Sequence, residues 1–370
     1  MKQKKKILAY LFGSLGDSIV AIPALRAARR QFPNAEIVLL QNFLTADLVK
    51  ASQVIPDELV DRNLSYNSGL GRAGKLSNFY RLWRTIRDER FDAAVYLVIS
   101  QRPKKAVLRD RLFFRSCGIT KLYGFRAFSD RELYPRTEDR RPAMTEHEAV
   151  RKLRRLESDG IEFRPDEDLR IPFFYFSRAE LDRIDRWLEA HIRQPDALLI
   201  GMAPGCKTKT NAWPLARFIE LGNRVMADTN CEIIIVGGPG EQEAGEQIIA
   251  AWGKGVNSAG KFSVRESGAL LSKCDLYIGL DTGTTHLAAS SGTKCLGIYG
   301  ERNNPGHWFP FGEGHTVLFH PVECAGCGLQ ECPVSGHPCM NGISVDAVWQ
   351  NLRPLLKRDA EAAPTKAVNV

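Results

Sequence analysis

The chain lacks a hydrophobic stretch long enough to cross a membrane. No apolar run approaches the roughly 18 residues that a spanning helix needs, which argues against an integral membrane protein. The basic start at Met1–Lys6 and the apolar run at Ile7–Phe12 are similar to a signal peptide, but Gly13–Asp17 ends the run early and no convincing cleavage site follows. We therefore expect a cytoplasmic protein.

Nucleic-acid motifs, exact repeats and low-complexity tracts are also missing. Without a helix-turn-helix, an aromatic RNP strand or zinc-finger spacing, we expect no nucleic-acid partner. The formal net charge of +8 still indicates an anionic partner, and a phosphorylated glycolipid at the inner membrane surface fits it, with peripheral association there. The basic residues gather in the N-terminal half, at Lys2, Lys4, Lys5, Lys6, Arg102, Lys104, Lys105, Arg109, Arg111, Arg115, Arg131, Arg136, Arg140 and Arg141.

The length indicates two domains. A chain of 370 residues exceeds what one hydrophobic core normally serves. Strand and helix patterns alternate in both halves, which predicts an α/β protein with two doubly wound parallel sheets. We place the domains at 1–172 and 173–345, followed by a C-terminal helix and flexible tail at 346–370, with the last ten or so residues disordered.

One strand runs directly into an anion-binding turn. The apolar run at Asp275–Leu280 precedes Asp-Thr-Gly-Thr-Thr-His at 281–286, and we expect a helix over His286–Ser291 that is capped by one of the threonines. A helix N-terminus offers free N–H groups to a phosphate, and Gly283 permits close backbone approach. The same pattern also fits a plain strand-to-helix connection, so it needs support from elsewhere in the chain.

A second turn of this kind lies near the N-terminus. A strand over Lys6–Phe12 leads into Gly13–Asp17, which opens a helix over about 18–32. Gly13 and Gly16 alone do not make the full G-x-G-x-x-G dinucleotide fingerprint. Asp17 has two interpretations: a first-turn carboxylate that compensates the helix dipole, or a general base that projects into a cleft between two domains.

Three motifs in this order and spacing resemble those of glycosyltransferase family 9, the heptosyltransferases. They are Gly13–Pro23 (GSLGDSIVAIP), Ala203–Pro214 (APGCKTKTNAWP) and Asp281–His286 (DTGTTH). The resemblance covers nearly the whole chain. It implies the GT-B architecture, in which two Rossmann-like domains face an interdomain cleft, with an N-terminal acceptor domain and a C-terminal nucleotide-sugar domain. It also implies inverting transfer of an ADP-activated heptose without a catalytic metal or cofactor.

The resemblance further implies roles for individual residues. Asp17 matches the general base and Asp281 would contact the donor sugar, while the Thr282–Thr285 backbone would hold the pyrophosphate. We add Gly16 and His286 to the donor site. The acceptor would be a lipopolysaccharide core, another anionic glycolipid or a protein, which the sequence does not distinguish. The expected donor-binding residues are Gly16, Lys207, Lys209, Asn211, Asp281, Thr282, Gly283, Thr284, Thr285 and His286.

One position departs from the family pattern. Asn211 stands where many members carry a lysine that meets a donor phosphate. Lys207 and Lys209 lie on the same loop and could substitute, because a flexible ammonium acts as a point charge. A donor with a different nucleotide or a different sugar therefore remains an alternative.

Four cysteines near the C-terminus form a separate motif within a turn-rich hairpin at 320–342. Cys324, Cys327, Cys332 and Cys339 have the spacing C-x2-C-x4-C-x6-C. Four thiolates suit a structural zinc or iron ion, and unliganded thiols that pack a small loop are the alternative. We expect the hairpin to serve structure or assembly, apart from the donor site.

Two other functions compete with a glycosyltransferase. A nucleotide-sugar epimerase or hydrolase on the same scaffold would need further carboxylates or histidines beside Asp17. A non-catalytic, metal-binding sensor of sugar nucleotides would leave Asp17 and Asp281 without a role.

Overall fold

The structure is a computed structural model that describes residues 4–43, 51–67, 72–357 and 366–369. The chain divides into two compact units. The first unit holds residues 1–133 and 146–173, and the second holds 134–145 and 174–370. The segment 134–145 therefore leaves the N-terminal part of the chain and packs with the second unit. Within the described ranges, no helix combines the length and apolar character that a bilayer span requires.

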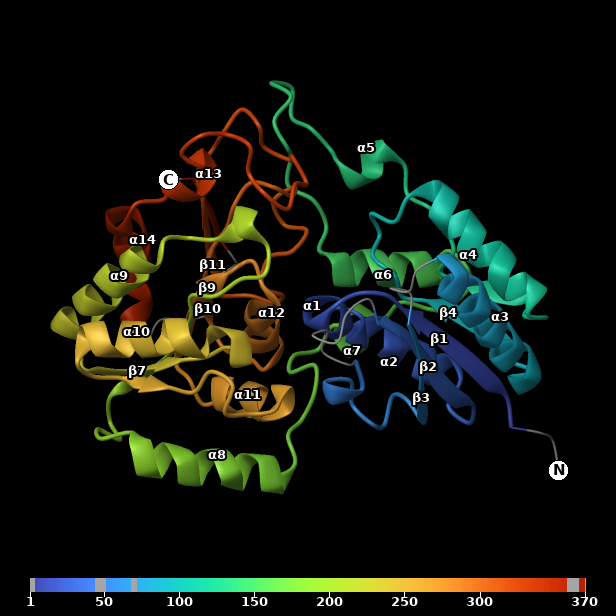
Figure 1. Cartoon of the computed structure of the whole chain (residues 1–370), viewed down its shortest axis with the longest axis horizontal. Coiled ribbons are helices and arrows are strands. Elements are labelled where there is room, and N and C mark those ends of the chain that lie inside the picture. The colour runs from blue at the N-terminus through green and yellow to red at the C-terminus, as the bar shows by residue number, and fades with distance from the viewer. Residues whose placement is uncertain (1–3, 44–50, 68–71, 358–365, 370) are drawn as a thin grey trace. The chain divides into compact units, whose positions relative to one another are not determined.

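The first unit is built on a five-stranded parallel sheet with the order β3-β2-β1-β4-β5 (Figure 1). Its strands are β1 (Lys6–Leu11), β2 (Glu36–Phe43), β3 (Arg62–Asn67), β4 (Ala93–Tyr96) and β5 (Lys121–Tyr123). Its helices are α1 (Leu15–Ile19), α2 (Ile22–Gln31), α3 (Arg72–Glu89), α4 (Lys104–Ser116), α5 (Asp130–Leu133), α6 (Glu148–Glu157) and α7 (Pro165–Asp168), and a 3-10 turn spans η1 (Ala51–Gln53).

The strand order places two connecting loops at the functional edge of this sheet. β1 lies between β2 and β4, so the connections that leave β1 and β4 run to opposite sides of the sheet, which is where ligands bind in open parallel sheets. The turn Gly13–Asp17 follows β1, and residues 97–102 follow β4. The N–H of Leu97 donates to the carbonyl of Tyr10 at 2.8 Å, which continues the pairing up to that edge.

The second unit repeats this design on a seven-stranded parallel sheet with the order β12-β11-β10-β9-β6-β7-β8. Its strands are β6 (Leu198–Ala203), β7 (Cys231–Ile235), β8 (Val256–Asn257), β9 (Leu276–Leu280), β10 (Cys295–Ile298), β11 (Thr316–Phe319) and β12 (Lys366–Asn369). Its helical segments are α8 (Arg178–His191), η2 (Lys209–Asn211), α9 (Leu215–Asp228), η3 (Pro239–Glu241), α10 (Gln242–Trp252), α11 (Val264–Leu271), α12 (Gly283–Ser290), α13 (Pro338–Asn341), α14 (Val345–Leu352) and η4 (Arg353–Leu356).

These two sheets confirm the predicted fold class of doubly wound, parallel α/β domains. Buried strand residues explain it: the central strands β4, β9 and β10 are buried along their whole length, as strands covered on both faces must be. Figure 1 shows helices on either side of each sheet.

Three local predictions were wrong or fall outside the described residues. Within the C-terminal tail, which was expected to be disordered, residues 366–369 form β12, which pairs in parallel with β11 through the register Thr316↔Lys366. Helix α12 begins at Gly283 rather than His286, because Thr282 takes the extended N-cap conformation. The sequence also predicts a helix near Ala46–Ser52, and most of this segment lies outside the described residues.

Candidate active site

Two loops of the second unit meet where its strand order reverses. β6 lies between β7 and β9, so the loop after β6 and the turn after β9 leave the sheet at neighbouring carboxyl ends. Asn211 from the first loop is buried, and its Nδ2 donates to the backbone O of Asp281 at 3.1 Å and to Asp281 Oδ2 at 3.2 Å. The topology thus brings together two of the residues that the sequence predicts for the donor site.

The Asp281 carboxyl has an unusual proton affinity. Burial raises its pKa to about 6, because desolvation penalises the carboxylate. The positive charge of Arg302 and hydrogen bonds from Asn211 and Asn303 act in the opposite direction. Asp281 therefore titrates close to neutral pH, which is where a group with a role in binding or catalysis is useful.

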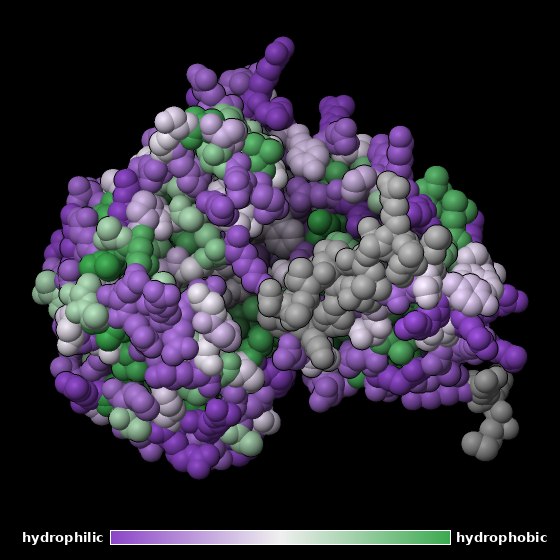
Figure 2. Space-filling view, viewed as in Figure 1, coloured by the Kyte–Doolittle hydropathy of each residue, from purple (hydrophilic) through white to green (hydrophobic). Residues whose placement is uncertain are grey.

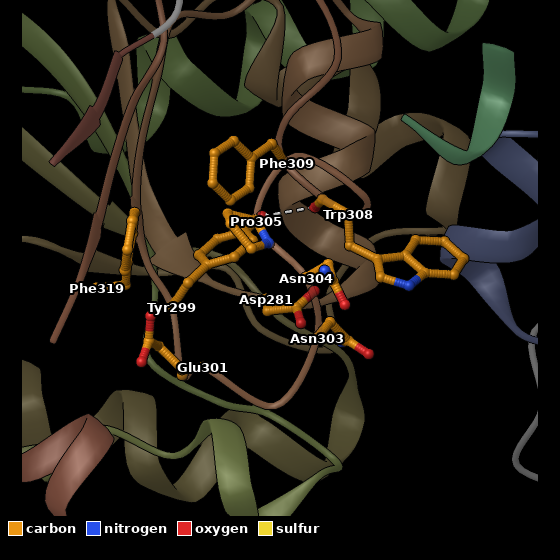
Figure 3. A pocket seen from close by; sticks show the side chains of 10 residues that line it. Asp281, Tyr299, Glu301, Asn303, Asn304, Pro305, Trp308, Phe309 and Phe319 are labelled. Carbon is orange, nitrogen blue, oxygen red and sulfur yellow. Dashed lines mark hydrogen bonds between the residues drawn. The ribbon is translucent and has the colours of Figure 1, made fainter. Parts of the chain in front are cut away.

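Asp281 lines a small pocket within the second unit (Figure 3). Its carboxylate lies beside the side chains of Asn303 and Asn304 in that view. Tyr299 closes another side, and its hydroxyl donates to the backbone O of Trp308 at 3.1 Å. The full lining is Asp281, Tyr299, Gly300, Glu301, Asn303, Asn304, Pro305, Trp308, Phe309 and Phe319. The cavity has a volume of about 20 Å³, which is too small to enclose a sugar, so a ligand would meet Asp281 at its mouth.

The loop 300–309 supplies most of this pocket and is held from two directions. The guanidinium of Arg302 donates to the carbonyls of Leu329 and Gly328, each at 3.0 Å, and thereby ties the loop to the cysteine hairpin. On the other side, Asn304 Nδ2 donates to the carbonyls of Pro135 and Ala143 in the segment 134–145, at 2.9 and 3.2 Å.

The expectation that the hairpin lies apart from the donor site is therefore wrong. Besides its bonds with Arg302, the hairpin accepts a hydrogen bond from Thr210 Oγ1 at Leu329 O, 2.8 Å away, beside Asn211. The sequence separation was misleading, because the chain returns to the carboxyl edge of the sheet after β11.

The N-terminus of α12 has the open backbone groups that an anion needs. Thr282 is the N-cap but makes no side-chain cap, so the first N–H groups, at Gly283 and Thr284, have no intrahelical partner. Thr285 is buried and donates from Oγ1 to the carbonyl of Leu280, so its side chain has a structural role. Burial lowers the pKa of His286 to about 4, so its imidazole is neutral at physiological pH.

The two lysines proposed to replace the family lysine are exposed on the loop that carries Asn211. Lys209 is exposed and its Nζ lies 2.8 Å from Glu331 Oε1 in the hairpin. Lys207 is exposed on the same loop. Asn211, in contrast, is buried and bonds directly to Asp281. The lysines are therefore flanking charges, and Asn211 is the residue that positions Asp281.

In the first unit, Asp17 caps the short helix α1. Its Oδ2 accepts hydrogen bonds from the N–H of Ser14 at 2.8 Å and from Ser14 Oγ at 3.3 Å, which forms a capping box. Gly13 has φ 145°, and a Cβ there would lie 2.3 Å from the Asp17 carboxyl, so only glycine fits beside it. Gly16 is buried inside α1. Asp17 is therefore a capping carboxylate in the first turn of α1 that accepts through Oδ2 alone, and its role as a general base stays a prediction.

Burial raises the pKa of the Asp17 carboxyl, while the hydrogen bonds of Ser14 and the charge of Lys152 lower it. Lys152 forms a fully buried ion pair with Glu148 at 2.9 Å on α6, and its Nζ also donates to Leu97 O at 2.8 Å. Ser100 donates to both oxygens of Glu148. The Lys152–Glu148 ion pair, with its hydrogen bonds to Leu97 and Ser100, therefore contacts the loop that follows β4. It lies close enough to Asp17 to influence the pKa of that carboxyl.

The four predicted metal ligands share one neighbourhood without forming a ligand shell. The negative charges of Cys332, Cys324 and Cys327 each raise the pKa of Cys339, after the larger effect of burial. However, the described residues contain no group of three or more His, Cys, Asp or Glu arranged to hold a metal ion. The metal site stays a prediction.

Sequence reasoning missed the loop 300–309 altogether. Asn303, Asn304 and Trp308 line the pocket, and Arg302 acts on the charge of Asp281. The available signal was the polar and aromatic run Glu301–Phe309 directly after the strand pattern that ends near Tyr299, since such loops lie at the ligand-binding edge of a parallel sheet.

Comparisons with known proteins find relatives over most of the chain. The sequence profile of glycosyltransferase family 9 (heptosyltransferase) matches residues 79–337. Lipooligosaccharide heptosyltransferase 2 of Campylobacter jejuni is 23% identical over 365 residues, which is 95% of this chain and 98% of the relative. Among solved structures, a family 9 glycosyltransferase from Veillonella parvula has a TM-score of 0.69 at 20% identity, over 96% of this chain and 98% of that one.

The ADP-heptose lipopolysaccharide heptosyltransferase II of Escherichia coli has a TM-score of 0.65 at 18% identity, over 95% of this chain and 98% of that one. These likenesses extend over both units, and they identify the two-sheet architecture as the GT-B fold. Since the family profile covers well over half of the sequence, the chain belongs to glycosyltransferase family 9 and is a glycosyltransferase.

Proposed function

We propose that the protein transfers a heptose, or a related sugar, from an ADP-sugar to a hydroxyl of a lipopolysaccharide core or similar acceptor, with inversion. The observation that carries the proposal is the hydrogen-bonded pair Asn211–Asp281 at the switch point of the second sheet, beside the open N-terminus of α12. An ADP-sugar donor would place the reaction in the cytoplasm.

In the donor site, backbone N–H groups would bind the pyrophosphate and side chains would bind the sugar. The N–H groups at the start of α12 would face the pyrophosphate, where helix dipole and free donors favour negative charge. Asp281 would accept hydrogen bonds from sugar hydroxyls at the mouth of the adjoining pocket. As the glycosidic bond breaks, charge grows on the leaving ADP, and fixed donors stabilise it without reorganisation.

Asp17 would be the general base for the acceptor hydroxyl. A hydroxyl is a poor nucleophile until its proton leaves as the new bond forms. Both Ser14 hydrogen bonds use Oδ2 and fix the carboxylate, so Oδ1 is the oxygen that would receive the proton. The raised pKa makes Asp17 a stronger base than an exposed aspartate.

The decisive test is Asp17→Asn with labelled ADP-heptose and a panel of core and protein acceptors. We expect transfer to fall by about 100-fold or more while donor affinity persists, the usual scale for a lost general base. Asp166→Asn on α7 is the matched control and should transfer normally. If Asp17→Asn kept near wild-type turnover at saturating substrates, Asp17 would not be the general base.

A second measurement addresses the nucleotide. ADP should raise the melting temperature more than UDP or GDP, because a ligand that binds only the folded protein stabilises it by mass action. If UDP or GDP stabilised more strongly, the donor would not be an ADP-sugar, although the transferase class would stand.

One observation favours a second candidate, hydrolysis or epimerisation of the nucleotide sugar. Glu301 lines the same pocket as Asp281, and burial raises its pKa, so two carboxyls with altered proton affinity face one cavity. Release of ADP from the donor at the same rate with and without acceptor would support hydrolysis against the transferase, and conversion of the donor into an isomeric ADP-sugar would support epimerisation.

We also propose that Cys324, Cys327, Cys332 and Cys339 take one structural zinc or iron ion after a local rearrangement. Their mutual influence on thiol pKa values supports it. Elemental analysis of protein purified without affinity-tag metals tests it. Less than about a tenth of an equivalent of zinc plus iron in a folded sample would leave only packed thiols.

A further inference from the structure

Two neighbouring helices of the first unit expose large apolar side chains to solvent. Leu108 and Leu112 on α4 are 57% and 56% exposed, and Phe79 and Tyr80 on α3 are 57% and 62% exposed. Single exposed apolar residues are ordinary, but four on adjoining helices are a patch. In Figure 2, hydrophobic side chains lie on the surface around α4, bordered by hydrophilic ones.

The two helices present this patch as one surface. The rings of Phe79 and Phe113 lie 4.9 Å apart, and Trp83 Nε1 donates to Ser116 O at 3.2 Å. Leu108 and Leu112 are one helical turn apart, so they form a ridge along α4. We call Phe79, Tyr80, Leu108 and Leu112 the apolar ridge.

On α4, the exposed charged side chains beside the apolar ridge are all cations. Lys104, Lys105, Arg109, Arg111 and Arg115 are all exposed on that helix. Its single acidic residue, Asp110, is buried and accepts hydrogen bonds from Tyr96, Arg102 and Arg109. The exposed face of α4 is therefore purely cationic around an apolar centre.

The fold does not need these side chains on the surface. α4 already packs its opposite face into the core through Val107 and Phe114, which are 3% and 1% exposed. Polar residues at positions 108 and 112 would serve that packing equally well. The arrangement instead has the composition of a helix that lies at a membrane interface, with an apolar strip between basic side chains.

We propose that the apolar ridge and the cations of α4 dock this unit onto an anionic lipid bilayer surface. The leucine and aromatic side chains would enter the boundary between headgroups and acyl chains, while the lysines and arginines would meet the anionic headgroups. Charge complementarity selects the bilayer over a second copy of the chain, because two copies would bring like-charged faces together.

Sedimentation of the full-length protein with vesicles tests the docking surface. Binding should be strong to phosphatidylcholine vesicles that contain about one third phosphatidylglycerol and weak to phosphatidylcholine alone. At about 0.5 M salt, where the screening length falls to roughly 4 Å, binding should decrease sharply. No acceptor or donor is present, so failure here would leave the proposed transferase activity in place.

Variants separate the two components of the surface. Leu108→Ser with Leu112→Ser should weaken binding at least about tenfold for each leucine, since each loses the burial of a large apolar side chain. Arg111→Gln with Arg115→Gln should weaken it about fivefold for each charge removed. Circular dichroism should show an unchanged fold, because these side chains are exposed.

The second unit provides matched controls. Tyr175→Ser removes an apolar side chain that is 64% exposed, and Arg178→Gln removes a cation that is 87% exposed. Both controls should bind anionic vesicles like the wild type. Equal binding of neutral and anionic vesicles would overturn the proposal, as would leucine variants that bind normally. Concentration-dependent dimers that the leucine changes abolish, without vesicle binding, would assign the ridge to self-association instead.

Discussion

Replacing Asp281 by asparagine should make the protein more stable at neutral pH while it impairs transfer. Folding moves the pKa of this carboxyl from its ordinary value of 3.8 to about 6. The folded state therefore binds the proton more tightly than the unfolded chain between these values. It follows that the free energy of unfolding decreases as pH rises from about 4 to about 6. Above about pH 6 this carboxyl is ionised in both states, so its contribution no longer changes with pH.

The magnitude follows from the size of the shift. A displacement of about two pKa units corresponds to about 3 kcal/mol, which is an upper bound because the pocket is partly open to solvent. The substituted amide would carry no charge to desolvate, and its oxygen can still accept from Asn211. We therefore expect Asp281→Asn to be more stable than the wild type by up to about 3 kcal/mol at about pH 7.5, and nearly equal at about pH 4.

Urea denaturation followed by tryptophan fluorescence is a suitable assay. Of the six tryptophans, only Trp83 belongs to the first unit, so the signal reports mainly on the unit that contains Asp281. Asp196→Asn, in an exposed loop, is the control and should show no such pH dependence. A stability difference between Asp281→Asn and wild type that stays constant from about pH 4 to 7.5 would refute the reasoning.

Three further outcomes follow from the site. Asn211→Ala should raise the pKa of Asp281 further, because it removes a hydrogen bond to the carboxylate, and a shift of the pH profile of donor binding toward higher pH is the measurement. Lys152→Met should destabilise the first unit by about 3 to 5 kcal/mol in urea titrations, since it leaves Glu148 buried without its partner; a smaller loss when Glu148→Leu is added would identify the broken pair as the cause. Because burial raises the pKa of Asp17, the acidic limb of the transfer-rate profile should lie at higher pH than for an exposed aspartate, and an unshifted limb would contradict its role as base.

Much of the fold could be predicted from the sequence, because it depends on patterns along short segments. The strand over 6–11 and the strand over 276–280 are continuous apolar runs that end in turn formers, and both turns lie where they were expected. Asp17 and the 281–286 turn follow from that same local pattern. Helix α4 was not predicted, since its apolar residues occupy two faces and its charges suggested only a basic segment.

Contacts between distant segments could not be predicted in this way. Asn211 was expected in the donor site, but no contact could be assigned to it, because its hydrogen bonds with Asp281 depend on the order of strands in the sheet. The polar and aromatic run of the loop 300–309 could have been noticed, but its anchoring by Arg302 could not, since it involves backbone carbonyls of Gly328 and Leu329, which carry no sequence signature.

The segment 134–145 has a consequence for how this chain could be recombined with a relative. It lies before the last helices of the first unit, yet Thr145 donates from its N–H to Pro305 O at 2.9 Å, and Asn304 binds two of its carbonyls. A chimaera that exchanges C-terminal halves at residue 173 would pair this segment with a foreign loop. The pocket beside Asp281 should therefore be transplanted in two pieces, 134–145 together with everything after 173, so that loop 300–309 keeps its hydrogen-bond partners.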